Sequence, residues 1–357
     1  MPERRRIVGL WRRGLGRVLV TLVRVEGSSY RRPGARLLVG AAGEYEGTIS
    51  GGCLETEVTR KAGWIVRGGA AVERYSTLFD DTAEIPFGLG CGGTVDLLFE
   101  AMGTEEAEVL LGAMEASLAG RQALVRTWLP GVGRRLGRVI ESGSGEVLFR
   151  SPWLTDEDLA SEEGVYRERL SSPQRLVVIG AGDDARPVAA MAGLLGWNVD
   201  VVDGRGQMAR TERFAGARSV GVVEDFGALD VGERDAVVLM THSYEQDRAA
   251  LAALLGRPRV RYVGILGARH RTALLVAEAS SMAGVTVEET CDRIHAPIGL
   301  DLGGDGPEAI ALAIVAEVQA SCQGRLPASR RLTAEDVAGQ IAEGGASRYL
   351  SAQCGVA

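Results

Sequence analysis

Short apolar runs alternate with stretches of helical periodicity along most of this chain, and the alternation is most regular after residue 174. The run 176–179 is followed by a glycine turn, by apolar positions at Val188, Met191 and Ala192, and by a second apolar run at 199–202. A short apolar run bounded by turn residues is typical of a buried parallel strand. The pattern therefore predicts a strand–helix–strand unit, which continues with strands at 219–223, 236–241 and 260–266 and helices at 244–255, 270–283 and 307–322.

The first 150 residues mix strand-like and helix-like periodicity less regularly. Residues 151–173 are acidic and polar, with serines and prolines at their ends, and we expect them to form a partly helical connector between two domains. Before this connector we expect strands at 17–25, 36–39, 72–76, 94–100, 123–128 and 146–149, and helices at 54–66 and 105–118.

The glycine turn indicates the class of the second domain. Gly180 and Gly182 open the predicted helix, and Asp203 ends the second strand about twenty residues later, as in the dinucleotide-binding fingerprint. We therefore expect an α/β protein with a mixed small N-terminal α/β domain over 1–150. A Rossmann-like parallel-sheet domain over 174–325 and a C-terminal tail over 326–357 would follow.

Two carboxylates in the same turn argue against a bound dinucleotide. Asp183 and Asp184 stand where backbone N–H groups would meet a pyrophosphate, and their charges repel a diphosphate unless a cation intervenes. Two interpretations stay open: the carboxylates cap the helix ahead of Pro187, or they hold a metal-bridged nucleotide. NAD(P) is a disfavoured ligand on either interpretation.

Composition narrows the partners and the compartment. The formal net charge is −7, so we expect neither nucleic acid nor an anionic membrane surface as a partner. No apolar run is long enough to cross a bilayer. The cysteines are odd in number and form no C-x-x-C pair, which indicates a reducing cytoplasm; they are Cys53, Cys91, Cys291, Cys322 and Cys354.

Two glycine–cysteine loops are the most unusual feature of the first domain. GTISGGCLETEV places Cys53 at the start of a predicted helix, and FGLGCGGTVDLL places Cys91 among glycines before a predicted strand. A helix N-terminus favours the thiolate form of a cysteine, and glycines let the backbone approach a ligand closely. The pair indicates a site that holds a soft metal or handles sulfur. The alternative is two small buried residues in tight turns. A zinc site is disfavoured, because no third and fourth ligand stand at the usual spacing.

A third segment, GSSYRRPGAR, brings Arg31, Arg32 and Arg36 together on one loop. Arginine forks bind phosphate well, although solvated surface arginines are the commoner case. His242 follows a predicted strand of the second domain, and His295 stands in the segment IHAPIGLDL. Ligands bind at the carboxyl edge of open α/β sheets, so the two histidines either line one cleft there or make structural hydrogen bonds.

In this order, the motifs resemble the XdhC/CoxI family, the xanthine dehydrogenase accessory factors. GSSYRRPGARLLV, GTISGGCLE and GCGGTVDLLFE match its N-terminal pattern. GAGDDARPVA, GWNVDVVDGR, THSYEQDRAAL, YVGILGARHRT and IHAPIGLDLGGDGPEAIALAIVAEV match its later part, so the resemblance extends over residues 17–322. Family members often have a histidine in the turn where this chain has Asp183, which indicates a subgroup.

The resemblance implies a cytoplasmic, homodimeric factor that binds molybdenum cofactor and supports its sulfuration with a cysteine desulfurase. Such a factor inserts the cofactor into an apo molybdenum hydroxylase such as xanthine dehydrogenase and has no turnover chemistry of its own. Cys53 and Cys91 would ligate the metal, because thiolates are soft ligands. The other residues expected to bind the cofactor are Arg31, Arg32, Arg36, Gly52, Glu55, Gly92, Gly93, Gly180, Gly182, Asp203, His242 and His295.

Two other functions stay open: an NAD(P)-linked oxidoreductase that uses the second domain, and an interaction scaffold with a vestigial nucleotide fold. The acidic turn argues against the first, and the glycine–cysteine loops argue against the second. We expect Cys53 and Cys91 to face a cleft that also holds the 180–184 turn and the 294–300 loop. Domain packing or a dimer contact would form that cleft.

The acidic turn leads to a direct test. We predict that NAD binds the unmodified protein poorly, and that Asp183→Gly or Asp184→Gly improves binding because each removes a charge that repels the pyrophosphate. Isothermal titration calorimetry without divalent metal measures this. Tight NAD binding by the unmodified protein would favour the oxidoreductase instead.

Overall fold

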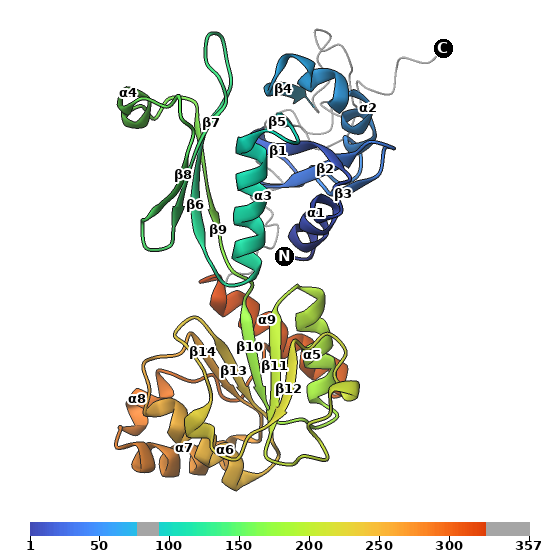
Figure 1. Cartoon of the computed structure of the whole chain (residues 1–357). Helices are drawn as coiled ribbons and strands as arrows, with labels where there is room; N and C mark the ends of the chain where they lie inside the picture. Colours follow the sequence, from blue (N-terminus) through green and yellow to red (C-terminus); the bar gives the residue numbers. More distant parts are fainter. Residues whose placement is uncertain (77–92, 326–357) are drawn as a thin grey trace, which may run out of the picture. The chain divides into compact units, whose positions relative to one another are not determined.

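The N-terminal unit contains an antiparallel sheet of strand order β3-β2-β1-β5-β4 (Figure 1). A computed structural model describes residues 1–76 and 93–325, and the chain divides into two compact units between Ser172 and Pro173. The strands of this sheet are β1 (Gly16–Gly27), β2 (Arg36–Gly40), β3 (Tyr45–Gly47), β4 (Ala71–Ser76) and β5 (Gly93–Ala101).

A second antiparallel sheet, of order β8-β7-β6-β9, belongs to the same unit. Helices α1 (Pro2–Arg12) and α3 (Glu105–Leu118) share one apolar core with both sheets, and α2 (Glu55–Ile65) covers the other face of the first sheet. A short 3₁₀ helix, η1 (Val66–Gly68), follows α2. The strands of the second sheet are β6 (Ala123–Trp128), β7 (Gly137–Ser142), β8 (Val147–Arg150) and β9 (Val165–Leu170).

The predicted connector over 151–173 is wrong for most of its length. It contains α4 (Asp156–Ala160) and β9, and β9 pairs antiparallel with β6 from Ala123↔Leu170 to Trp128↔Val165. The charged sequence of β9 concealed it: Arg167 and Arg169 lie on its solvated face, and Glu168 between them is paired with Arg36. The N-terminal unit therefore extends to Ser172.

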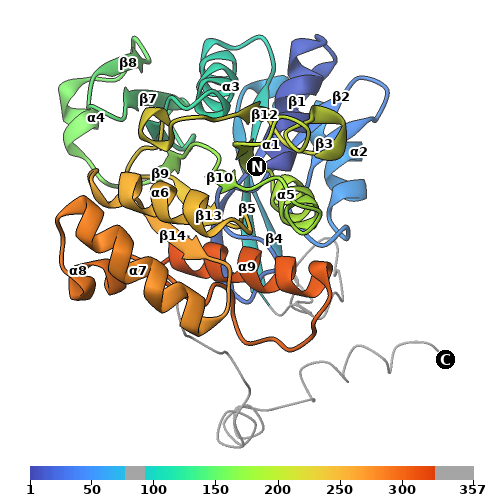
Figure 2. The ribbon, with the colours of Figure 1, turned by 90° about the horizontal axis from the view of Figure 1, so that it is seen from below.

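The C-terminal unit is a parallel sheet of order β12-β11-β10-β13-β14 with helices on both faces (Figure 2). Side chains of β10 alternate between the two cores: Leu176 and Val178 pack toward α5 and α9, while Val177 and Ile179 pack toward α6 and α7. The strands are β10 (Arg175–Ile179), β11 (Asn198–Asp203), β12 (Ser219–Val222), β13 (Ala236–Leu239) and β14 (Tyr262–Ile265). The helices are α5 (Ala185–Leu194), η2 (Thr211–Arg213), η3 (Phe226–Ala228), α6 (Tyr244–Leu255), α7 (Arg269–Ala283), α8 (Val287–Cys291) and α9 (Pro307–Cys322).

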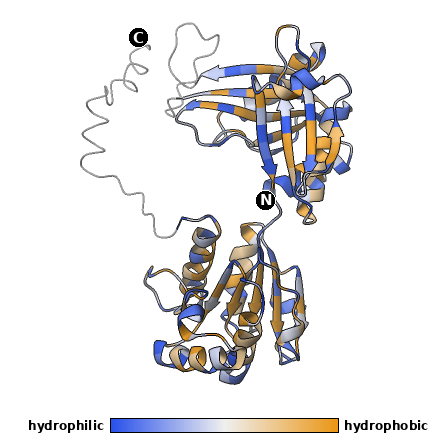
Figure 3. Ribbon diagram, turned by 90° about the vertical axis from the view of Figure 1, so that its left-hand side faces the viewer, coloured by the Kyte–Doolittle hydropathy of each residue, from blue (hydrophilic) through white to orange (hydrophobic). Residues whose placement is uncertain are grey.

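The predicted fold class is confirmed: a mixed N-terminal α/β domain precedes a Rossmann-like parallel sheet. Figure 3 shows the difference in pattern, since the strands of the N-terminal sheets alternate in hydropathy and those of the parallel sheet are largely apolar. The sequence pattern missed β3 and α8, which are short, α1, whose exposed face is charged, and β7, which contains the buried Arg138. None of the described helices is long and apolar enough to cross a membrane.

A buried ion pair joins the two sheets of the N-terminal unit. Arg138 on β7 is 1% exposed, and its Nη1 and Nη2 donate to the Glu100 carboxylate on β5 at 2.9 and 3.2 Å. Arg138 Nη1 also donates to the Glu106 carbonyl at the start of α3, and Arg138 Nε donates to Thr127 Oγ1 at 3.2 Å. One guanidinium thus links both sheets and the first turn of α3.

Removing one partner of this pair leaves a buried charge without compensation. We predict that Glu100→Ala lowers the free energy of unfolding of the N-terminal unit by about 3–5 kcal/mol, measured by urea denaturation of the full chain. Glu162→Ala is the matched control, because its salt bridge to Arg167 is exposed and its loss leaves the midpoint unchanged. Equal effects of the two substitutions would contradict the conclusion that the buried Arg138–Glu100 pair stabilises this unit.

Candidate functional site

The loop that precedes Cys53 is held from inside by Glu55. Its Oε1 accepts from the N–H groups of Ile49 and Ser50 at 3.0 and 2.9 Å, and its Oε2 accepts from the Ser50 hydroxyl. Burial disfavours the charged carboxylate, but the hydrogen bonds from Ser50 and Ile49 outweigh it and keep the pKa of Glu55 below its ordinary value. Glu55 is 1% exposed. In this structure it positions the loop, and its contact with the cofactor stays a prediction.

Cys53 is half-buried at the end of this loop, two residues before α2 begins. Its Sγ donates to Ser50 Oγ at 3.4 Å, and the same hydroxyl accepts from the N–H groups of Gly52 and Leu54 at 3.2 and 3.1 Å. Gly52 has φ +108°, a conformation that favours glycine. The Ser50 hydroxyl therefore fixes the thiol on the approach to the helix N-terminus, a role that the sequence pattern did not reveal.

The arginine loop lies beside the cysteine loop. A Cβ placed on Gly51 would lie 3.7 Å from the ring of Tyr30, which is 73% exposed. Arg32 is also exposed, and it forms no salt bridge with another described residue. An aromatic ring and a solvated cation thus accompany the thiol on the surface of this unit. Tyr30 is a residue that the sequence analysis passed over, although it stands within the arginine motif.

The other two predicted phosphate ligands are used inside the fold. Arg36 is 5% exposed, pairs with Glu168 on β9 and donates to the Gly34 carbonyl at 3.2 Å. Arg31 pairs with Glu3 of α1. Both guanidiniums tie the loop to neighbouring elements, and phosphate binding by either one stays a prediction. Arg32 is the arginine of the motif that stays available.

Gly93, the first described residue after the second cysteine, lies beside the arginine loop. A Cβ on Gly93 would collide with the carbonyl oxygen of Ser28, so the glycine is needed where β5 begins against the arginine loop. The structure therefore brings the cysteine loop and the start of β5 against the arginine loop. Cys91 and Gly92 lie outside the described residues. Within 1–76 and 93–325, no three His, Cys, Asp or Glu side chains form a cluster that could hold a metal ion.

The fingerprint acid of the C-terminal unit has no free hydrogen-bonding capacity for a ribose. Asp203 is fully buried and accepts from the Ala181 N–H at 2.7 Å, from the Arg205 N–H at 2.8 Å and from the Arg205 guanidinium at 2.9 and 2.8 Å. Burial disfavours its charge, but the hydrogen bonds from Arg205 and Ala181 keep the pKa of Asp203 below its ordinary value. Asp203 fastens the glycine turn, and its expected role in cofactor binding stays a prediction.

The turn itself is built as the sequence predicts. Gly180 has φ +123°, and a Cβ on it would collide with the carbonyl of Met240 after β13. Gly182 faces Asp184 and His242. These residues lie at the carboxyl ends of β10 and β13, where the strand order reverses and open α/β sheets bind ligands.

The two carboxylates of the turn do not cap the helix. Asp184 is the N-cap residue of α5, yet its side chain makes no capping hydrogen bond; its Oδ2 lies 2.7 Å from His242 Nε2. Asp183 Oδ1 accepts from Arg213 Nη2 at 2.9 Å. The capping interpretation is therefore wrong, because side chains from later loops take both carboxylates. His242 has φ +60°, a conformation that is uncommon for a residue other than glycine and that recurs at ligand-binding turns.

His295 belongs to a different cluster. Its ring stacks on Tyr262 with centroids 4.4 Å apart, and its Nδ1 lies 3.7 Å from Glu317 Oε1. Glu317 Oε2 accepts from the Tyr262 hydroxyl at 2.5 Å and from the Gly299 N–H at 2.8 Å. Since His242 and His295 have separate partners, a structural role for each accounts for its contacts. The expectation that Cys53 and Cys91 face a cleft with the 180–184 turn stays a prediction.

Two family profiles match the chain. Residues 176–318 match the XdhC Rossmann domain, and residues 10–76 match the XdhC and CoxI family. The chain belongs to this family. The first match covers the parallel sheet with its glycine turn, and the second covers the strands and loops that carry Tyr30, Arg32 and Cys53.

Relatives that match this chain over most of its length support the same family. A protein of Bacillus subtilis named as a probable xanthine dehydrogenase subunit is 26% identical over 84% of this chain and 92% of its own length. The molybdenum cofactor insertion chaperone PaoD of Escherichia coli is 27% identical over 85% of this chain and 83% of its own. A solved structure described as a xanthine dehydrogenase from Bacillus halodurans is 27% identical, covers 94% of this chain and 99% of its own, and has a TM-score of 0.76.

The buried Asp203 makes the stability of the C-terminal unit dependent on pH. Because its folded pKa is lowered, its contribution is present above the unfolded pKa of about 3.9 and is lost as the pH falls through the folded value. We predict that Asp203→Asn costs about 1–3 kcal/mol at pH 7 and progressively less in acid, measured by chemical denaturation across pH. Asp230→Asn is the control, because the Asp230 side chain is fully exposed. It should change neither the free energy of unfolding nor its dependence on pH. If the loss of stability in Asp203→Asn did not depend on pH, it would not come from the charge of Asp203.

Proposed function

We propose that this protein is a maturation factor that binds molybdenum cofactor and inserts it into a molybdenum hydroxylase such as xanthine dehydrogenase. The carrying observation is the half-buried Cys53 thiol, fixed on an internally braced glycine loop beside the exposed Tyr30 and Arg32. A relative named as a molybdenum cofactor insertion chaperone supports the proposal, and so does one named as a probable component of xanthine dehydrogenase.

The three side chains fit the chemistry of this cargo. Molybdenum cofactor is a phosphorylated pterin whose own dithiolene sulfurs hold the metal, so a carrier needs to add only one or two soft ligands. A Cys53 thiolate supplies such a ligand reversibly. Arg32 offers a guanidinium fork for the phosphate, and the Tyr30 ring offers a stacking surface for the flat pterin.

The bracing of the loop suits transfer to a partner. Glu55 and Ser50 fix the backbone before any ligand arrives, so binding orders few additional groups. A site formed by one exposed loop cluster can be approached by a second protein while the cargo is still held. These features favour a carrier that releases its ligand, in place of an enzyme that encloses a substrate.

The finer parts of the proposal rest on the family resemblance. We infer that the protein works in the cytoplasm as a homodimer, and that it supports sulfuration of the bound cofactor with a cysteine desulfurase as the sulfur donor. Cys91 would be the second thiol of the site. The N-terminal domain would carry the cofactor through its cysteine loop.

The Cys53 thiol gives the sharpest test. We predict that Cys53→Ala weakens binding of molybdenum cofactor roughly tenfold or more, because one metal ligand is lost. The measurement is the molybdenum and pterin content of anaerobically purified protein, together with titration of the cofactor. Arg32→Gln should weaken binding less and reduce its dependence on salt.

Cys291→Ala is the matched control, since Cys291 is an exposed thiol on α8 of the other unit. It should retain the cofactor as the unmodified protein does. Full retention of cofactor by Cys53→Ala, with a circular dichroism spectrum like that of the unmodified protein, would refute the proposed site.

A further inference from the structure

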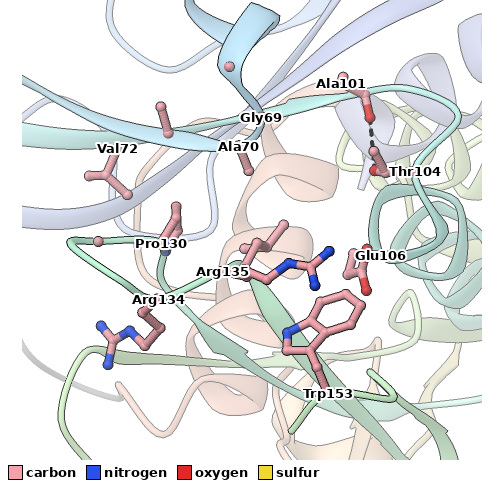
Figure 4. A pocket seen from close by; sticks show the side chains of 14 residues that line it. Gly69, Ala70, Val72, Ala101, Thr104, Glu106, Pro130, Arg134, Arg135 and Trp153 are labelled. Carbon is pink, nitrogen blue, oxygen red and sulfur yellow. Dashed lines mark hydrogen bonds between the residues drawn. The ribbon is translucent and has the colours of Figure 1, made fainter.

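A cavity of about 630 Å³ opens in the N-terminal unit, away from the cysteine loop (Figure 4). Its walls come from η1 and the start of β4, from the turn between β5 and α3, from the loop between β6 and β7, and from the segment after β8. A cavity of this size accommodates a small organic ligand. The helix α2 separates it from Cys53: the thiol precedes the first turn and the cavity follows the last, and 11 residues span about 16 Å.

An arginine and a tryptophan lie against each other in the wall of this cavity. The guanidinium carbon of Arg135 lies 4.9 Å from the centre of the Trp153 ring, and Figure 4 shows the guanidinium beside the indole. Arg135 forms no salt bridge or hydrogen bond with another described residue. The Trp153 indole N–H is buried, and no described residue accepts a hydrogen bond from it. A buried N–H without a partner costs free energy, and a ligand that accepts from it would recover that cost.

The other polar groups of the wall are already engaged. Arg134 Nε and Nη1 donate to the carbonyls of Leu129 and Glu163 at 2.8 and 3.0 Å. Glu106 is 7% exposed, and its Oε1 accepts from Ser151 Oγ at 2.9 Å. A ligand therefore meets its donors on the Arg135 and Trp153 side, and an anionic group is the natural partner for them.

The rest of the wall is apolar and made of small residues. Ala70, Val72 and Leu136 line it, and Gly68 and Gly69 leave room for a bulky group. Arginine planes and indole rings both stack on flat partners, and the guanidinium also attracts anions. The cavity therefore combines a surface for a ring with a donor pair for a charged oxygen.

We propose that this cavity binds a small aromatic anion: a flat ring that carries a phosphate or a carboxylate. Arg135 and the Trp153 N–H would bind the anionic oxygens, and the glycine–alanine wall would hold the ring. This site is separate from the one proposed for molybdenum cofactor and does not depend on it. A ligand here would add a second small-molecule signal or substrate to the N-terminal unit.

Matched pairs of probes test whether the ligand must be an anion, and whether its charge comes from a phosphate or from a carboxylate. AMP and nicotinate carry the anion as phosphate and as carboxylate, and adenosine and nicotinamide are their neutral counterparts. Isothermal titration calorimetry with the full chain should show that at least one anionic probe binds at least tenfold more tightly than its neutral partner. Inorganic phosphate alone should bind more weakly than AMP, because it lacks the ring.

Two variants separate the two donors. Arg135→Gln should remove the preference for the anionic probe, and Trp153→Phe should weaken anion binding roughly tenfold while it keeps a ring beneath Arg135. Arg121→Gln, an exposed arginine just beyond the other end of α3, is the control and should bind as the unmodified protein does. Thermal midpoints show that each variant is folded.

Several outcomes would overturn the proposal. The proposal is wrong if neither anionic probe binds at concentrations up to the millimolar range. It is also wrong if the charged and neutral probes of each pair bind equally well. Unchanged anion binding in Arg135→Gln would place the ligand elsewhere on the chain. Arg135→Gln should retain molybdenum cofactor whichever of these results is obtained. These experiments therefore do not test the cofactor site proposed at Cys53.

Discussion

The N-terminal unit depends on one buried charge that must be satisfied from several elements at once. Arg138 comes from the second sheet, and its hydrogen bonds reach β5 of the first sheet and the start of α3. A buried guanidinium without its carboxylate would cost several kcal/mol, so the two sheets are held in one arrangement. The cavity with Arg135 and Trp153 opens beside this junction, with walls from the same strands and the same helix turn.

The same logic governs the two glycine turns. In the cysteine loop Glu55 takes the backbone N–H groups of Ile49 and Ser50, and in the Rossmann-like turn Asp203 takes the Ala181 N–H. A carboxylate inside a turn fixes the backbone, but its oxygens and the N–H groups that donate to them are no longer free for a ligand. The first turn still presents a thiol, whereas the second has its fingerprint acid occupied by Arg205. The chemistry available to a ligand therefore lies mainly in the N-terminal loops.

Much of the fold follows from local pattern. The apolar runs of β10, β11 and β13 and the periodic helices α3 and α6 are long or strongly patterned, so periodicity alone locates them. Strand β9 carries charged residues on its solvated face, and only its pairing with β6 makes it a strand. Helix α1 has a basic sequence whose few apolar residues, Ile7, Val8 and Leu10, acquire meaning when they are buried.

The sequence by itself determined the motifs: the glycine turns, the cysteine at a helix start, the arginine loop and the order that marks the XdhC and CoxI family. Tertiary structure alone decided which of these groups are free. Arg31 and Arg36 look equivalent to Arg32 in the sequence, yet Glu3 and Glu168 neutralise them. Those partners lie 28 and 132 residues away in the chain, and no local pattern reveals a pairing over such separations. A charge is available to a ligand only when the fold has not already paired it, because a buried pair is costly to break.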